Sequence, residues 1–115
     1  MSEPNCLFCK MAAGTIPVKQ VYEDEHALAF HDIAPKAPQH ILIIPKEHIA
    51  SLNEATEYKI TLGHLLTLVP PIAASLGIGE TGYRTVINTG ADGGQTVSHL
   101  HIHLLGGRPL AWPPG

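Results

Sequence analysis

Positive charge and long apolar runs are both scarce in this sequence. Lys and Arg number 7 against 10 Asp and Glu, the formal net charge is −3, and the basic residues form no cluster. Electrostatic capture of a long polyanion, such as a nucleic acid or an anionic membrane, is therefore disfavoured, although a small anion is not excluded. No segment approaches the ~20 apolar residues of a membrane span, and the beginning of the chain lacks a basic stretch followed by an apolar one. We expect a cytoplasmic protein without nucleic acid or membrane partners.

Cysteine is nearly absent as well, because Cys6 and Cys9 are the only two, in the spacing C-x-x-C. One closely spaced pair cannot cross-link a secreted fold, so the pair is a redox couple, half of a metal site or two ordinary thiols. The redox interpretation is the less favoured one, because no thioredoxin-like βαβ pattern surrounds the pair. The residues that partner these thiols must decide between the others.

The remaining composition is that of one globular domain spanning residues 1–115. Hydrophobic residues make up 44% of the chain and charged residues 15%, without a low-complexity run or an internal repeat. Periodicity and turn residues predict an N-terminal helix over about residues 6–13, strands over residues 19–23, 27–31, 40–44, 83–89 and 98–105, and an irregular tail over residues 106–115. We predict an α+β fold with a five-stranded, mostly antiparallel sheet and with one short and one long helix on one face.

The long helix should begin at one of two N-cap candidates, Ser51 or Asn53, and end at Gly77. An apolar stripe follows this segment up to Leu76. The pair Pro70-Pro71 lies within it, and proline inside a helix removes backbone donors and clashes with the preceding turn. We therefore expect a kink, or two shorter helices that meet at the prolines.

Histidine is the residue type in excess, with 8 in the chain, more than Lys and Arg together. His99, His101 and His103 alternate with apolar residues, so they should share one face of the last strand while the apolar residues enter the core. Alternate strand residues are ~6.6 Å apart and the outer pair ~13 Å, so two neighbours can chelate a metal ion but three cannot. We expect imidazoles with different roles. Three exposed histidines without a role, or a metallohydrolase in which His99 and His101 hold the metal, are the alternatives.

A glycine-rich loop, Gly90 to Thr96, directly precedes this strand. Such a loop can point backbone N–H groups at an oxyanion, although taken alone a simple hairpin loop is the better explanation. Its position beside the histidine row favours phosphate chemistry, because neutral imidazole is nucleophilic towards phosphorus and, with an ordinary pKa of ~6.5, is largely unprotonated at neutral pH. Backbone amides and the other histidines can then stabilise charge on phosphoryl oxygens.

The segment H-L-H-I-H-L-L resembles the histidine triad motif, H-x-H-x-H followed by apolar residues. Further segments are similar to the Hint branch of that family, and they are CLFCKMAAGTIP from Cys6, FHDI from Phe30, APQHILIIPKEH from Ala37, Asn88, DGGQ from Asp92, LGGRP from Leu105 and the final WPPG. Their order and spacing match over almost the whole chain. The resemblance implies a HIT-like fold that pairs as a homodimer.

What the resemblance implies for function is a purine nucleotide-binding hydrolase that splits nucleoside 5′-phosphoramidates into a nucleoside monophosphate and an amine. A nucleotidyl-histidine would be the intermediate, no cofactor would be required for catalysis, and purine nucleoside monophosphates and phosphoramidates would be the ligands. Two alternatives stay open. One is dinucleoside polyphosphate hydrolysis or nucleotidyl transfer, as in other histidine triad branches, and the other is a nucleotide-binding or protein-binding module with little turnover.

The resemblance also implies a role for each site residue. His101 would be the nucleophile, with His99 orienting its surroundings and His103 and His40 around the phosphate. Asp32 would accept hydrogen bonds from the ribose hydroxyls. The phosphate and leaving group would be held by Asn88, Gly94, Gln95 and Thr96, and the base slot would be lined by Leu7, Phe8, Met11, Phe30, His31, Ile33 and Leu42, of which Phe8, Met11 and Leu42 are core residues on pattern alone. Trp112 in the tail resembles a residue that reaches towards the partner's active site.

Cys6, Cys9, His48 and His99 resemble a zinc site that some histidine triad proteins carry. A Cys2His2 set is closed and tetrahedral, so the zinc would be structural and would fix His99 beside the nucleophile. The thiols would then be metal ligands.

Two positions depart from the Hint pattern. Thr96 stands where serine is common, which retains the hydroxyl with less rotamer freedom and could alter protonation of the leaving group. Pro70-Pro71 lies in a helix that contributes to the expected dimer interface. His26 and His64 match no role and are expected on the surface.

Overall fold

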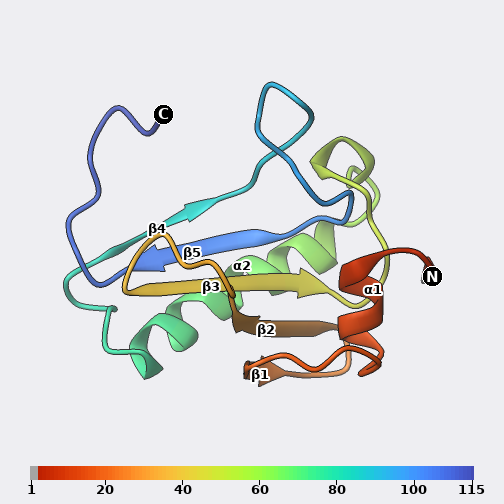
Figure 1. Cartoon of the computed structure of the whole chain (residues 1–115), viewed down its shortest axis with the longest axis horizontal. Helices are drawn as coiled ribbons and strands as arrows, with labels where there is room; N and C mark the ends of the chain where they lie inside the picture. Colours follow the sequence, from red (N-terminus) through yellow and green to blue (C-terminus); the bar gives the residue numbers. More distant parts are fainter. Residues whose placement is uncertain (1–2) are drawn as a thin grey trace.

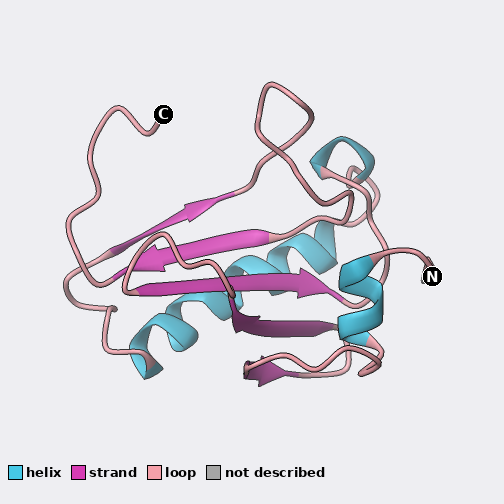
Figure 2. Cartoon of the chain, viewed as in Figure 1, coloured by secondary structure: helices cyan, strands magenta, loops and turns pink. Residues whose placement is uncertain are grey.

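The computed structural model describes residues 3–115, which contain a five-stranded antiparallel sheet with one helix on each face (Figure 1, Figure 2). The strand order is β1-β2-β3-β5-β4, and the strands are β1 Gln20–Glu23, β2 Ala27–His31, β3 Gln39–Pro45, β4 Tyr83–Val86 and β5 Ile102–Gly106. The short helix is α1, Leu7–Ala12, and the long helix is α2, Lys59–Ser75. The predicted α+β fold is confirmed. No helix in the described part of the chain is both long and apolar enough to span a bilayer.

The sheet has a separate hydrophobic core on each face, and adjacent residues of its central strands contribute to different cores. On one face the sheet packs against the buried residues of α2, which are Leu65, Leu68, Val69, Ile72 and Ala73. On the other face Phe8 of α1 packs against Leu28, Phe30, Leu42 and Ile44. Because strand side chains alternate between faces, the adjacent residues Ile41 and Leu42 belong to different cores. The expectation that both helices cover one face is wrong, because β2 and β3 are apolar on both sides and α1 covers the second.

Helix α2 is continuous through Pro70 and Pro71, so of the two expected outcomes, a kink or two shorter helices, the second is wrong. Both prolines lie on the exposed side of the helix, whereas Val69 and Ile72 beside them are buried against the sheet. Packing of the apolar stripe therefore outweighs the backbone hydrogen bonds that the prolines remove.

The start of the long helix also differs from the prediction. Ser51 caps a separate 3-10 helix, η1 Leu52–Glu54, by accepting a hydrogen bond from the Asn53 amide at 3.1 Å. Helix α2 begins later, at Lys59, and its N-cap residue Tyr58 makes no side-chain cap. The expectation that Ser51 or Asn53 caps the long helix is therefore wrong, and Ser51 caps the shorter helix instead.

The strand bounds agree with the prediction for β2 and differ most beside the histidine row. β4 ends at Val86 instead of residue 89, and β5 begins at Ile102 instead of residue 98, so His99 and His101 precede the strand. Its partner explains this limit, because β3 pairs with β5 up to Ile43 and ends at Pro45, which has no N–H to extend the ladder. The alternation of side chains nevertheless continues, since Leu100, Ile102 and Leu104 are all buried in the main core.

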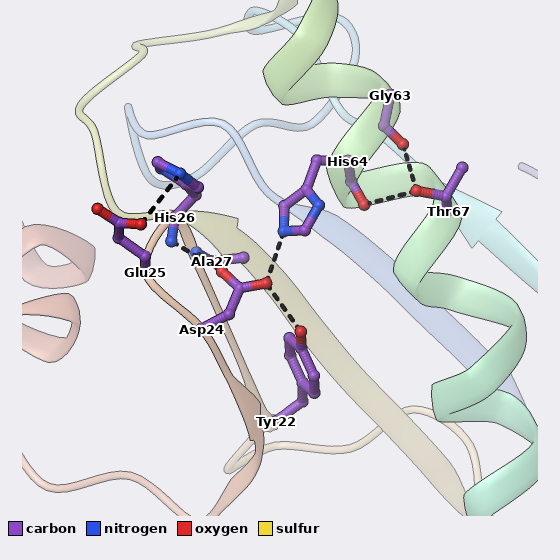
Figure 3. Close-up of polar contacts among 8 residues, drawn as sticks. All are labelled: Tyr22, Asp24, Glu25, His26, Ala27, Gly63, His64 and Thr67. Atoms are coloured by element: carbon purple, nitrogen blue, oxygen red, sulfur yellow. Dashed lines mark hydrogen bonds and ion pairs between the residues drawn. The ribbon is translucent and has the colours of Figure 1, made fainter.

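A polar cluster joins the turn between β1 and β2 to helix α2 (Figure 3). The Asp24 carboxylate accepts hydrogen bonds from the Tyr22 hydroxyl at 2.8 Å, from the His64 imidazole at 2.6 Å and from the backbone amides of His26 and Ala27. Partial burial raises the pKa of Asp24, but these bonds outweigh it and lower the pKa to about 2. His26 is exposed as expected, whereas His64 is half-buried and bound to Asp24.

Candidate active site

The face of the sheet that carries α1 contains a cavity of about 550 Å³. All seven residues predicted for the base slot line it, namely Leu7, Phe8, Met11, Phe30, His31, Ile33 and Leu42, and Asp32 lies beside them. Four further lining residues were not predicted, namely Pro17, Val18, Lys19 and Val97. All four lie outside the helices and strands of the structure. Pro17 ends the first matched segment and Lys19 begins a predicted strand, but neither signal marks a cavity wall.

The cavity reaches part of the histidine row. Thr96, His101 and His103 line it. The other residues predicted to act in catalysis or to hold the phosphate are not among its lining residues, namely His40, His99, Asn88, Gly94 and Gln95. The three imidazoles do not form an exposed row, because His101 is only 5% exposed and His99 is 0% exposed. Its ring is enclosed by Phe8 of α1 and by His48.

The imidazole of His101 is oriented by the backbone of His99. Its Nδ1 lies 2.7 Å from the carbonyl oxygen of His99, and a carbonyl oxygen can only accept, so Nδ1 carries the hydrogen. In the neutral ring Nε2 then holds a lone pair. Phe8 meets the ring edge-on at a centroid distance of 5.1 Å and limits its rotation. The arrangement presents one unprotonated ring nitrogen beside the cavity.

His99 is held in the opposite tautomer. Its Nε2 donates to the Pro45 carbonyl oxygen at 2.8 Å, so its Nδ1 is unprotonated and faces Cys6 Sγ at 3.2 Å and Cys9 Sγ at 3.5 Å. Burial lowers the pKa of His99 to about 4, with smaller contributions from His48 and His101. The ring is therefore neutral at pH 7, as a metal ligand must be.

A second pair of histidines, His40 and His103, adjoins the Asp32 carboxylate. His40 Nε2 lies 2.9 Å from His103 Nδ1 and 3.5 Å from Asp32 Oδ2. Burial lowers the pKa of His40, and burial together with His101 and His40 lowers the pKa of His103 to about 4. Both rings are therefore neutral near pH 7, and His101 has uncharged histidines around it.

Hydrogen bonds made by the side chains of Asn88 and Gln95 hold the glycine-rich loop in place. Asn88 Nδ2 donates to the Gly93 carbonyl oxygen at 2.7 Å. Gln95 accepts from the Gly90 amide and donates to the Ala50 and Val97 carbonyl oxygens. Gly94 has a φ of 79°, which side chains rarely adopt. The polar atoms of Asn88 and Gln95 thus shape the loop that leads to Thr96.

Four potential metal ligands converge beside α1. The ligand atoms of Cys6, Cys9, His48 and His99 all lie within 4.8 Å of one another, and Cys9 Sγ is 3.3 Å from His48 Nδ1. Zinc bonds of about 2.3 Å to sulfur and 2.1 Å to nitrogen place tetrahedral ligands about 3.5 Å apart, so the set fits a closed zinc site. Burial raises the pKa of the Cys9 thiol, which favours its protonated form when no cation is bound.

The C-terminal tail is anchored away from the cavity of its own chain. Arg84 on β4 donates to the Ala111 carbonyl oxygen at 2.8 Å, and its guanidinium carbon lies 6.0 Å from the centre of the Trp112 ring. Trp112 is 80% exposed and is not among the residues that line the cavity. The ring is therefore available to a neighbouring molecule.

Known proteins carry the same architecture. The chain matches the HIT domain model over residues 13–110. It is 63% identical over 116 residues to a HIT-like protein of Synechococcus elongatus, with 100% of both chains covered. It is similar in structure to a HIT family hydrolase of Legionella pneumophila, with a TM-score of 0.94 at 51% identity, covering 96% of this chain and 100% of that one. A histidine triad nucleotide-binding protein of Candida albicans follows with a TM-score of 0.82 at 33% identity, covering 95% and 83%. Both the alternating histidines beside the cavity and a match over most of the chain lead to one assignment: the protein belongs to the HIT domain family.

Proposed function

We propose that this protein is a purine nucleotide-binding hydrolase that cleaves nucleoside 5′-phosphoramidates through a nucleotidyl intermediate on His101. The observation that carries the proposal is the 2.7 Å bond between His101 Nδ1 and the His99 carbonyl oxygen. Because that bond uses the ring hydrogen, Nε2 keeps its lone pair and can attack phosphorus. His101 lines the cavity, so a phosphate held there can meet this nitrogen.

The apolar part of the cavity suits a purine base. Leu7 and Ile33 line it although they are 43% and 99% exposed, and a flat aromatic ring would cover both side chains. Asp32 adjoins them, and its carboxylate would accept hydrogen bonds from the two ribose hydroxyls. The slot offers few polar groups to the base edges, so it would discriminate weakly between purines.

The reaction would consist of two displacements at the α-phosphorus. In the first, His101 Nε2 bonds to phosphorus, the phosphorus–nitrogen bond of the substrate breaks, and the departing amine takes a proton from the Thr96 hydroxyl. In the second, water attacks phosphorus and returns a proton to Thr96, while the bond to Nε2 breaks and the nucleoside monophosphate leaves. Thr96 suits this part because its side chain lines the cavity together with His101.

The names of relatives support the reaction class. The similar protein of Legionella pneumophila is described as a HIT family hydrolase, and that of Candida albicans as a nucleotide-binding protein. Hydrolysis of dinucleoside polyphosphates would use the same intermediate with a different leaving group. The leaving group is therefore the part of the proposal that experiment must decide.

Mass spectrometry of the protein quenched during turnover of adenosine 5′-phosphoramidate tests the proposal. We expect an added adenylyl group on the peptide that carries His101. Faster turnover of diadenosine polyphosphates would instead assign the protein to another reaction of the family. Bound AMP without turnover of either substrate would identify a binding module, and an adduct on a different residue would exclude His101 as the nucleophile.

We also propose that two chains form a homodimer. The outer face of α2 exposes Ile60 (89%) in its first turn and Leu66 (46%) one turn before the two prolines, and Trp112 in the tail is 80% exposed. Large exposed apolar side chains favour association, and Trp112 would then reach the partner's cavity. Light scattering at micromolar concentration should give twice the chain mass of 12.3 kDa, and a value equal to the chain mass would contradict the dimer.

A structural zinc ion completes the proposal. Cys6, Cys9, His48 and His99 would hold it, and it would tie α1 to the segment that carries the nucleophile. Zinc supplies no step of the reaction at this place, because a closed set of four protein ligands leaves no position for water. Both cysteines are free thiols, which suits the cytoplasmic location that we propose.

A further inference from the structure

A chain of three hydrogen-bonding groups runs from the loop after β2 to the cavity. The Lys36 amide donates to His40 Nδ1 at 3.0 Å, and His40 Nε2 lies 2.9 Å from His103 Nδ1. His103 lines the cavity, whereas His40 is only 5% exposed and is not among the lining residues. His40 thus reaches the cavity through another side chain.

The direction of each hydrogen bond in this chain follows from its first member. A backbone amide can only donate, so His40 Nδ1 must be the unprotonated nitrogen of its ring. The hydrogen of neutral His40 then lies on Nε2 and is donated to His103 Nδ1. His103 Nδ1 is therefore an acceptor, and its own ring hydrogen lies on Nε2, the nitrogen that remains for a ligand.

We propose that His40 is a positioning residue that fixes His103 in the tautomer with hydrogen on Nε2, so that His103 offers an N–H donor to a phosphoryl oxygen. The use of that donor rests on the proposed function, whereas the tautomer is a property of the free protein. His103 and His101 consequently present different groups to a phosphate, one a donor and the other a lone pair. His101 offers a lone pair to phosphorus, and His103 offers a hydrogen to oxygen.

The surroundings of both rings support this assignment. Burial lowers the pKa of both His40 and His103, so each ring is neutral near pH 7 and has a defined tautomer. Asp32 Oδ2 lies 3.5 Å from His40 Nε2, which is too long for a strong hydrogen bond. The hydrogen on His40 is therefore directed to His103, and the Asp32 carboxylate keeps its capacity for other donors.

The same three side chains could be mistaken for a metal site, because ligand atoms of Asp32, His40 and His103 lie within 4.8 Å of one another. A cation there would need the lone pair of His40 Nε2. The ring hydrogen would then move to Nδ1 and meet the Lys36 N–H, leaving two donors facing each other at 3.0 Å. The Lys36 amide thus selects hydrogen bonding over metal binding.

Two substitutions of His40 each remove one of its two hydrogen bonds, the one from the Lys36 amide or the one to His103. In His40→Gln, the amide nitrogen takes the place of Nε2 and still donates to His103. In His40→Asn, the amide oxygen takes the place of Nδ1 and still accepts from Lys36, but the donor to His103 is lost. The two variants lose different bonds and are similar in polarity, so a purely structural role would affect them alike.

The tautomer of His103 is read directly from nitrogen-15 NMR of the ligand-free protein at pH 7. We expect hydrogen on Nε2 in the parent protein and in His40→Gln, and a mixture of tautomers in His40→Asn. For adenosine 5′-phosphoramidate we expect kcat to fall roughly 10²-fold in His40→Asn with KM changed much less, and to recover most of its value in His40→Gln.

Hydrogen on Nδ1 of His103 in the parent protein would overturn the proposal, and this measurement needs no variant. So would an unchanged tautomer and kcat in His40→Asn, or one equivalent of zinc or nickel bound in the parent protein and lost in that variant. If the parent protein cleaves no phosphoramidate, the proposed function fails, while the NMR result still decides the role of His40.

Discussion

The backbone carbonyl oxygen of His99 accepts the ring hydrogen of His101 at 2.7 Å. The same residue sends its side chain away from the cavity, where Nδ1 faces the two thiols. One residue therefore orients His101, the proposed nucleophile, with its backbone and joins the potential metal set with its imidazole. Burial of that ring fixes the backbone on which the orientation of His101 depends.

Replacement of the nucleophile separates binding from turnover. His101→Ala removes the lone pair that attacks phosphorus but leaves the apolar slot and Asp32 intact. We expect kcat to fall at least ~10³-fold, while the dissociation constant of AMP, measured by calorimetry, changes only a few-fold. An adenylyl adduct that persists in this variant would show that another residue is the nucleophile.

Zinc should be present in the purified protein and should affect stability more than chemistry. We expect about one zinc ion per chain by elemental analysis, lost in His48→Ala and retained in His26→Ala, a control at an exposed histidine. Removal of zinc should lower Tm, because metal binding contributes to folding free energy. It should leave the parent rate within a few-fold, since His101 is not a ligand. A loss of activity that any added divalent ion restores would support a metallohydrolase.

The sequence is sufficient to predict an element where local rules and tertiary packing agree. β2 has the predicted bounds because the turn at Asp24-Glu25 and the proline-containing loop after His31 enclose a short apolar run. The seven residues predicted for the base slot also meet at one cavity, and their positions came from matched segments and not from periodicity. On pattern alone, Phe8 and Leu42 are core residues, and the structure makes them both core and cavity wall.

Long-range contacts account for what could not be predicted. The start of β5 depends on Pro45 of its partner strand, and the continuity of α2 through two prolines depends on the sheet beneath it. The bond between Asp24 and His64 joins residues 40 positions apart, and no local pattern announces it. His40 is another case, because only the structure reveals that the Lys36 amide determines the direction of its hydrogen bonds.

Acid should weaken the fold through the buried histidines, of which His103 is one and His99, with a pKa that burial also lowers to about 4, is another. Burial lowers the pKa of His103 from the ordinary 6.5 to about 4, so the unfolded chain binds a proton more readily between these values. The stabilisation is complete above pH 6.5 and is lost as pH falls towards 4, with a total of about 3 kcal/mol. Urea unfolding at several pH values measures it. The slope of the free energy of unfolding against pH, between pH 6.5 and 4, should be smaller by up to about 1.4 kcal/mol per pH unit in His103→Gln. An unchanged slope would contradict the lowered pKa of His103.

Asp24 should act in a lower pH window. Its pKa of about 2 lies below the ordinary 3.8, so its contribution is present above pH 3.8 and is lost as pH falls through this range towards 2. The shift corresponds to about 2 kcal/mol. Asp24→Asn should therefore lower the free energy of unfolding at pH 7 by about this amount, measured with urea. Glu25→Gln is the matched control, because that neighbour is 88% exposed, and equal effects of the two variants would exclude a special role for the Asp24 cluster.

Arg84 should influence activity only through Trp112. The arginine holds the tail at Ala111 and stacks near the indole, so Arg84→Met frees the ring while leaving the cavity of its own chain untouched. If Trp112 contributes to the partner's cavity, kcat/KM should fall several-fold in both Arg84→Met and Trp112→Ala. The double variant should be no worse than Trp112→Ala alone, because two residues that act through one contact are not additive. Multiplied losses in the double variant would assign Arg84 an independent role, and tryptophan fluorescence anisotropy that stays unchanged in Arg84→Met would show that the arginine does not hold the tail.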